Sequence, residues 1–116
     1  MAGARMRRVN EAVREVLSAH LAEGLKDPRI GFVTVTGVET SPDLRNARVY
    51  VSVLGDEHAR EDALEGLRSS RGFLQAQLGE ELRLKRTPTL TFMYDDSVDR
   101  GMRISSLLAE RGGGDK

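Results

Sequence analysis

The stretch from Arg68 to Tyr94, RSSRGFLQAQLGEELRLKRTPTLTFMY, determines the fold that we expect for this chain. Two short amphipathic segments meet at Ser70-Arg71-Gly72, and a basic run, Arg83-Leu84-Lys85-Arg86, leads into a strand. Because glycine lacks a Cβ, the backbone at Gly72 can turn sharply or lie against a ligand, and the cations can neutralise phosphate. The pattern predicts a kinked helix pair beside a surface for a polyanion, with RNA as the expected ligand.

The elements within this stretch follow from its periodicity. The helix before the kink begins near Asp56, among acidic residues that suit the positive end of a helix, and its inward face ends at Leu67. A second helix continues from Phe73 to Leu82. Beyond Pro88, apolar and polar residues alternate up to Tyr94, which is the pattern of a strand.

The preceding part of the chain predicts one helix and a β-hairpin. Apolar residues recur at helical spacing from Met6 to about Leu25, and Asp27-Pro28 ends this helix. Valine and threonine alternate from Phe32 to Val38, and a second alternating segment runs from Ala47 to Val53. Ser41-Pro42-Asp43 supplies the turn between them, so we expect two antiparallel strands.

The expected order is therefore αββααβ, followed by a short C-terminal helix over Val98–Glu110. This order predicts an α+β fold with helices packed on one face of a three-stranded sheet, in one domain over residues 1–111 with a flexible glycine-rich tail over 112–116. A helix pair between two strands in this order is the arrangement of a type II K-homology domain. In that fold a G-x-x-G loop between the helices clamps a nucleic-acid backbone, and this chain has Ser70-Arg71-Gly72 in its place.

Composition limits the possible classes of protein. The chain has 116 residues, 39% hydrophobic and 31% charged, which suits one compact domain, and it has no cysteine for disulfides or thiolate sites. No apolar run is long enough for a membrane span, and we expect a soluble cytoplasmic protein. The net charge is zero, but Arg5, Arg7 and Arg8 cluster early and acidic residues crowd the middle around Asp56–Glu65, so we expect a bipolar molecule.

Catalytic chemistry finds little support in the sequence. The best metal candidate is the group Asp95, Asp96, Ser97 and Asp99, but its spacing does not fit a calcium loop, and helix capping explains it better. No nucleophile or acid is spaced to make a general base of His20 or His58. The three phenylalanines occupy apolar-periodic positions and are predicted to be core residues rather than base-stacking platforms: Phe32, Phe73 and Phe92.

Several segments in order along the chain resemble the bacterial ribosome-binding factor A family. Together they span nearly the whole sequence and are highly specific. They are Lys26-Asp27-Pro28-Arg29-Ile30-Gly31, Asp43-Leu44, Val49-Tyr50-Val51, Gly72-Phe73-Leu74, Leu78-Gly79, Leu82-Arg83-Leu84-Lys85-Arg86, Tyr94-Asp95-Asp96-Ser97 and Gly101-Met102-Arg103-Ile104.

This resemblance implies a type II K-homology fold in which an Ala-x-Gly kink replaces the G-x-x-G loop. Ser70 stands here where the family usually has alanine, and its hydroxyl could cap the following helix. The resemblance also implies binding to free 30S subunits near the 5′-terminal helix of 16S rRNA. Support of late 30S maturation and 16S processing, and a role in cold adaptation, are implied as well.

We therefore expect a monomeric RNA-binding assembly factor with no enzymatic activity, cofactor, metal, small-molecule substrate or membrane. The expected partners are the 30S subunit and 16S rRNA. The alternative is a protein-interaction module that docks through its acidic helix, Glu61–Glu65, with RNA contact incidental. The residues predicted to bind RNA are Ser70, Arg71, Gly72, Arg83, Lys85 and Arg86, with Arg5, Arg7 and Arg8 as secondary contacts.

Overall fold

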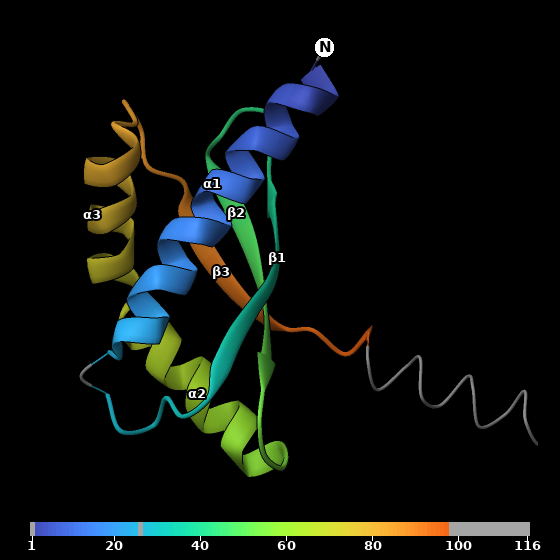
Figure 1. Cartoon of the computed structure of the whole chain (residues 1–116), viewed down its shortest axis with the longest axis vertical. Helices are drawn as coiled ribbons and strands as arrows, with labels where there is room; N and C mark the ends of the chain where they lie inside the picture. The colour runs from blue at the N-terminus through green and yellow to red at the C-terminus, as the bar shows by residue number, and fades with distance from the viewer. Residues whose placement is uncertain (1, 26, 98–116) are drawn as a thin grey trace, which may run out of the picture.

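The computed structural model describes residues 2–25 and 27–97, so the expected helix over Val98–Glu110 and the tail over 112–116 lie outside the described residues. Helices and strands occur in the order that the sequence predicts (Figure 1). Their bounds are α1 Ala2–Glu23, β1 Val33–Thr40, β2 Asn46–Val53, α2 Glu57–Ser69, α3 Arg71–Leu82 and β3 Thr89–Tyr94.

The sheet has the strand order β1-β2-β3, and the helices cover one of its faces (Figure 1). β1 and β2 are antiparallel, as expected, with a bulge between Val35 and Gly37. β3 is parallel to β2, with Asn46 opposite Thr89. A parallel pair needs a crossover connection, and the α2–α3 pair provides it. The predicted α+β architecture is thus confirmed.

One hydrophobic core joins the helices to the covered face of the sheet. Val13 and Leu17 of α1 and Leu74 and Leu78 of α3 are essentially fully buried. Inward positions of the strands alternate with exposed ones, as their sequences predict. The other buried members are Val16, Val35, Val38, Ala47, Val49, Val51, Val53, Ala63, Leu67, Leu90 and Phe92.

Two of the three phenylalanines predicted to be core residues are not in the core. Phe92 is 3% exposed, but Phe32 is 80% exposed and Phe73 is 51% exposed. Phe32 has the same parity as the exposed Thr34 and Thr36, so strand alternation turns it away from the helices. Phe73 lies one helical step from the buried Leu74, which places it at the margin of α3's inward face.

The helix break also differs from the prediction. α2 ends and α3 begins at Ser70, whose φ of −90° and ψ of 2° interrupt the helix. Gly72 lies in the first turn of α3, and a Cβ added there would meet nothing within 4 Å. The kink therefore needs no glycine, because the backbone angles of Ser70 are open to any residue. Ser70 makes no side-chain cap bond to α3.

None of the helices in the described part of the chain is long and apolar enough to cross a membrane.

Candidate nucleic-acid interface

Two basic clusters that are far apart in the sequence lie at the same end of the molecule, where α1 begins and α3 ends (Figure 1). Val9 of α1 and Arg86 of the α3–β3 loop line the same small hollow, together with Leu44 of the β1–β2 turn. The Thr89 amide donates to the Arg45 carbonyl at 2.8 Å, which fixes the turn against the start of β3. We call this end of the molecule the basic end and define it by its exposed cations, Arg5, Arg7, Arg8, Arg83, Lys85 and Arg86.

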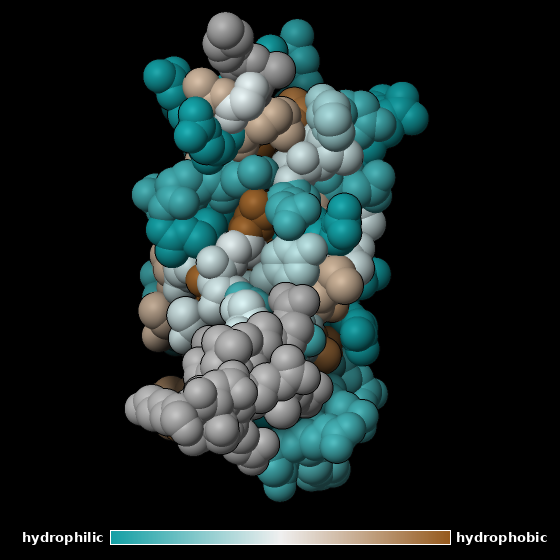
Figure 2. Space-filling view, turned by 90° about the vertical axis from the view of Figure 1, so that its right-hand side faces the viewer, coloured by the Kyte–Doolittle hydropathy of each residue, from teal (hydrophilic) through white to brown (hydrophobic). Residues whose placement is uncertain are grey.

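The basic end carries charge that the rest of the described chain leaves uncompensated. None of its six side chains forms an ion pair with a carboxylate of residues 2–25 or 27–97. Figure 2 shows hydrophilic side chains along this face of the molecule, from the upper end to the lower end, with apolar side chains among them. The acidic start of α2, Asp56 and Glu57, lies at the opposite end (Figure 1). The bipolar distribution expected from the sequence is present in space.

Arg83 has a structural role besides its charge. It ends α3 in the left-handed region, with φ of 52°, and its amide donates to the Gly79 carbonyl. The Leu84 amide donates to the same carbonyl at 3.2 Å. This closing turn directs the chain back along the helix toward β3 and leaves Arg83 exposed at the tip.

Arg71 does not join the basic end. It opens α3, whereas Arg83 follows the end of this 12-residue helix, so about 18 Å of helix separates them. Its side chain is half-buried, and its Nε is enclosed without a hydrogen-bond partner among the described residues. The predicted RNA-binding residues therefore fall into two groups, one at the helix break and one at the basic end.

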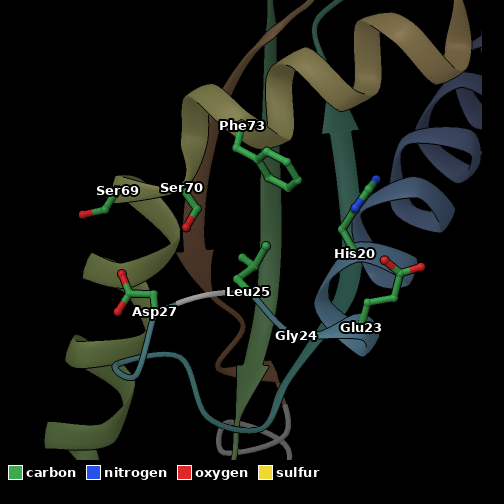
Figure 3. A pocket seen from close by; sticks show the side chains of 8 residues that line it. All are labelled: His20, Glu23, Gly24, Leu25, Asp27, Ser69, Ser70 and Phe73. Carbon is green, nitrogen blue, oxygen red and sulfur yellow. The ribbon is translucent and has the colours of Figure 1, made fainter.

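A hollow of about 550 Å³ lies beside the helix break, between the end of α1 and the α2–α3 junction (Figure 3). Phe73 and His20 approach each other there, with ring centroids 5.6 Å apart and planes at 86°. The His20 side chain is 16% exposed, and its Nε2 lies 2.6 Å from a Glu81 carboxylate oxygen. The hollow is lined by His20, Glu23, Gly24, Leu25, Asp27, Ser69, Ser70 and Phe73.

The loop after α1 forms one wall of this hollow and is fixed to α2 by polar contacts. Asp27 accepts from the Arg29 amide at 2.9 Å and from the Arg29 guanidinium at 3.0 and 2.7 Å. These hydrogen bonds lower the pKa of Asp27 from 3.8 to about 2. Arg29 also donates to the Ser69 hydroxyl at 2.9 Å and pairs with Glu65 at 3.2 Å. Ile30 packs where a Cβ of Gly66 would lie.

Sequence reasoning missed Phe73 as a surface residue and the pair Phe32 and Leu54. Leu54 is 75% exposed, and its amide donates to the Phe32 carbonyl at 3.1 Å, so the two side chains sit at neighbouring positions beyond the end of the hairpin. Strand parity could have revealed Phe32. No sequence signal identified Phe73, because it falls on an apolar-periodic position.

The residues weighed as a metal site have other contacts. The Asp95 carboxylate accepts from the Thr36 hydroxyl at 2.5 Å and from the Ser97 amide at 2.9 Å. Asp99 lies outside the described residues. Across residues 2–25 and 27–97, no three histidine or carboxylate side chains come together as a metal-binding group.

Comparison with known proteins places the chain in a family. A family model described as ribosome-binding factor A matches residues 5–108. Ribosome-binding factor A of Anaeromyxobacter sp. (strain K) is 59% identical over 104 residues, which cover 89% of this chain and 75% of that protein. The crystal structure of ribosome-binding factor A from Thermus thermophilus matches with a TM-score of 0.67 and 29% identity, covering 77% of this chain and 94% of that one.

A second structural match comes from a complex with 30S. It is a homology model of the Thermus thermophilus ribosome-binding factor A, fitted into a cryo-EM map of its complex with 30S. It matches with a TM-score of 0.57 and 33% identity, covering 73% of this chain and 93% of that one. The likeness to these structures agrees with the K-homology-like α+β fold expected from the sequence. The chain belongs to the ribosome-binding factor A family.

Proposed function

We propose that this protein binds the 30S ribosomal subunit and contacts the backbone of 16S rRNA with its basic end. The observation that carries the proposal is that six exposed cations without a described carboxylate partner lie at one end of the molecule. They are Arg5, Arg7, Arg8, Arg83, Lys85 and Arg86. Such cations bind phosphate by releasing condensed counterions. Family membership makes the ribosome the expected source of that phosphate.

The finer parts of the proposal follow the family resemblance. The protein acts on free 30S subunits near the 5′-terminal helix of 16S rRNA, assists late maturation and 16S processing, and matters most in the cold. It works as a monomer in the cytoplasm and carries out no catalytic step. The neutral net charge supports weak binding to naked RNA and stronger binding to a formed particle, because only one end attracts phosphate.

Co-sedimentation with purified 30S subunits across a salt series tests this proposal. Replacing Arg83, Lys85 and Arg86 together by alanine should weaken binding and flatten the slope of log K against log[salt] by about 2 to 3 units, roughly 0.9 per lost contact. The matched control is Arg14→Ala, because Arg14 is already paired with Glu11 on α1. An unchanged slope in the triple variant would refute phosphate contact by this end.

A second candidate function is protein docking through the acidic helix, and one observation favours it. Phe32 and Leu54 are exposed close to the acidic start of α2, which suits a partner with basic and apolar residues. Replacing Glu57 and Glu61 by glutamine distinguishes the two functions. Loss of 30S binding in this variant, with binding intact in the basic-end triple variant, would favour protein docking.

A further inference from the structure

The hollow beside the α2–α3 break has the size and chemistry of a site for one unpaired base. Its volume of about 550 Å³ lies within the range of small-ligand sites, about 300 to 1,000 Å³. It opens between the end of α1 and Ser70 (Figure 3). It therefore lies away from the basic end, where the phosphate contacts are proposed.

Phe73 offers an aromatic surface to this hollow. Its side chain is 51% exposed, although large apolar side chains in the described chain are otherwise mostly buried. The perpendicular contact with His20 fixes the orientation of the ring and covers at most one of its faces. His20 is itself held by Glu81 at 2.6 Å, so the platform is pre-oriented. Bases stack on such rings in single-stranded nucleic-acid sites.

The polar groups around the platform favour a hydrogen-bond donor as ligand. Glu23 is exposed and pairs with no described cation, whereas both carboxylate oxygens of Asp27 are already held by Arg29. The Ser70 hydroxyl makes no cap bond and can accept or donate. The Glu23 carboxylate repels phosphate but can accept from the exocyclic amino groups of adenine and cytosine, where uracil presents a carbonyl.

The phosphate of a nucleotide bound in the hollow can contact a cation, Arg68, outside it. Arg68 is exposed in the last turn of α2, directly before Ser69, which lines the hollow. A nucleotide whose base enters the hollow can therefore place its phosphate outside it, on the Arg68 side. The base of a bound nucleotide would thus lie in the hollow, and its phosphate would lie outside the hollow near Arg68.

We propose that this hollow binds one unpaired adenine or cytosine of the rRNA, stacked on Phe73, with its amino group donating to the Glu23 carboxylate. This assignment rests on the proposed binding of 16S rRNA. It differs from the basic end in chemistry, because the basic end reads only phosphate. It gives the protein a preference for a single-stranded nucleotide next to a structured backbone.

NMR titration of the ¹⁵N-labelled protein with the RNA tetranucleotides A4, C4 and U4 tests the assignment. We expect A4 and C4 to shift the amides of Ser69, Ser70 and Phe73 and to bind more tightly than U4. Phe73→Leu should weaken A4 binding about 5- to 150-fold, the usual range for loss of one stacked base. Phe73→Tyr keeps the ring and should bind normally. The matched control is Phe32→Leu, an exposed phenylalanine outside the hollow, which should change nothing.

Several outcomes would overturn the assignment. A4 that shifts no amide around the hollow, or binds Phe73→Leu as tightly as the unaltered protein, excludes stacking on Phe73. Equal binding of U4 excludes the role of the Glu23 carboxylate. Tighter binding of a tetra-arginine peptide at the same amides would make the occupant a protein side chain. Co-sedimentation with 30S, run in parallel, separates the two proposals: sedimentation without shifts at the hollow rejects only the base site.

Discussion

Gly66→Ala and Gly72→Ala are the same substitution in adjacent helices, and we expect them to change stability in opposite directions. A Cβ at Gly66 would lie 2.6 Å from Ile30 Cγ1 and 3.3 Å from Asp27 Cγ, whereas one at Gly72 would meet nothing within 4 Å. Neither glycine has a positive φ, so alanine fits the backbone at both sites. The difference between the two variants therefore measures how firmly the loop after α1 packs on α2.

The expected magnitudes follow from two opposing effects. Alanine gains up to about 0.5 to 1 kcal/mol over glycine in a helix, because it loses less backbone entropy on folding. Overpacking a close contact costs about 1 to 3 kcal/mol. Gly72→Ala should therefore raise the free energy of unfolding by about 0.5 kcal/mol. Gly66→Ala should lower it by about 1 kcal/mol, equivalent to roughly 4 to 8 °C in Tm for a domain of this size.

Urea denaturation of both variants, followed by circular dichroism, measures these changes. A second substitution, Ile30→Ala, removes the Cγ1 atom that the new methyl group would meet, so Gly66→Ala should cost less stability in the Ile30→Ala background than in the unaltered protein. If Gly66→Ala is as stable as Gly72→Ala, the loop does not pack on α2 as described. A destabilised Gly72→Ala would restore the view that this glycine sets the kink.

Three further predictions concern Asp27, Arg83 and the carboxylates that follow β3. The pKa of Asp27 is lowered from 3.8 to about 2, so its carboxylate stabilises the fold above pH 4 and that stabilisation is lost as the pH falls from about 4 to 2. Stability measured over this window should fall less steeply in Asp27→Asn, and an unchanged slope would contradict the hydrogen-bonded loop. Arg83→Gly should stabilise the protein by about 1 kcal/mol, because glycine adopts positive φ freely, and should flatten the 30S salt slope by about 1 unit; a less stable variant would show that the arginine stem packs on the fold. Replacing Asp95, Asp96 and Asp99 by asparagine should leave 30S binding and 16S maturation near normal, and a maturation block with binding intact would revive the metal-site hypothesis.

The sequence predicted the elements well because their apolar periodicity is strong. The described part of the chain has the expected order of helices and strands, and β2 begins within one residue of its predicted start at Ala47. The break between α2 and α3 was placed two residues late, at Gly72 instead of Ser70. The break was predicted at Gly72 because glycine adopts backbone angles that other residues avoid. The observed angles at Ser70 do not require glycine.

The candidate site could be predicted only in part, because it depends on contacts between distant segments. The run of cations from Arg83 to Arg86 is visible in the sequence, but its position at the same end as Arg5–Arg8 depends on how α1, the β1–β2 turn and the α3–β3 loop pack together. Likewise, the contact of Phe73 with His20 of α1 joins residues far apart in the sequence. Local periodicity carries no information about either arrangement.

The parallel pairing of β2 with β3 has a consequence for the order of folding. The hairpin of β1 and β2 is local, but Asn46 reaches its partner Thr89 only after α2 and α3 have been traversed. Such non-local pairing forms late, because loop-closure entropy is lost before the contact is gained. During translation, Leu90 and Phe92 cannot seal the core until Tyr94 has left the exit tunnel. The apolar faces of the helices therefore stay exposed in a nascent chain until β3 has been synthesised. A chain that ends before Thr89 should bind chaperones and should not fold.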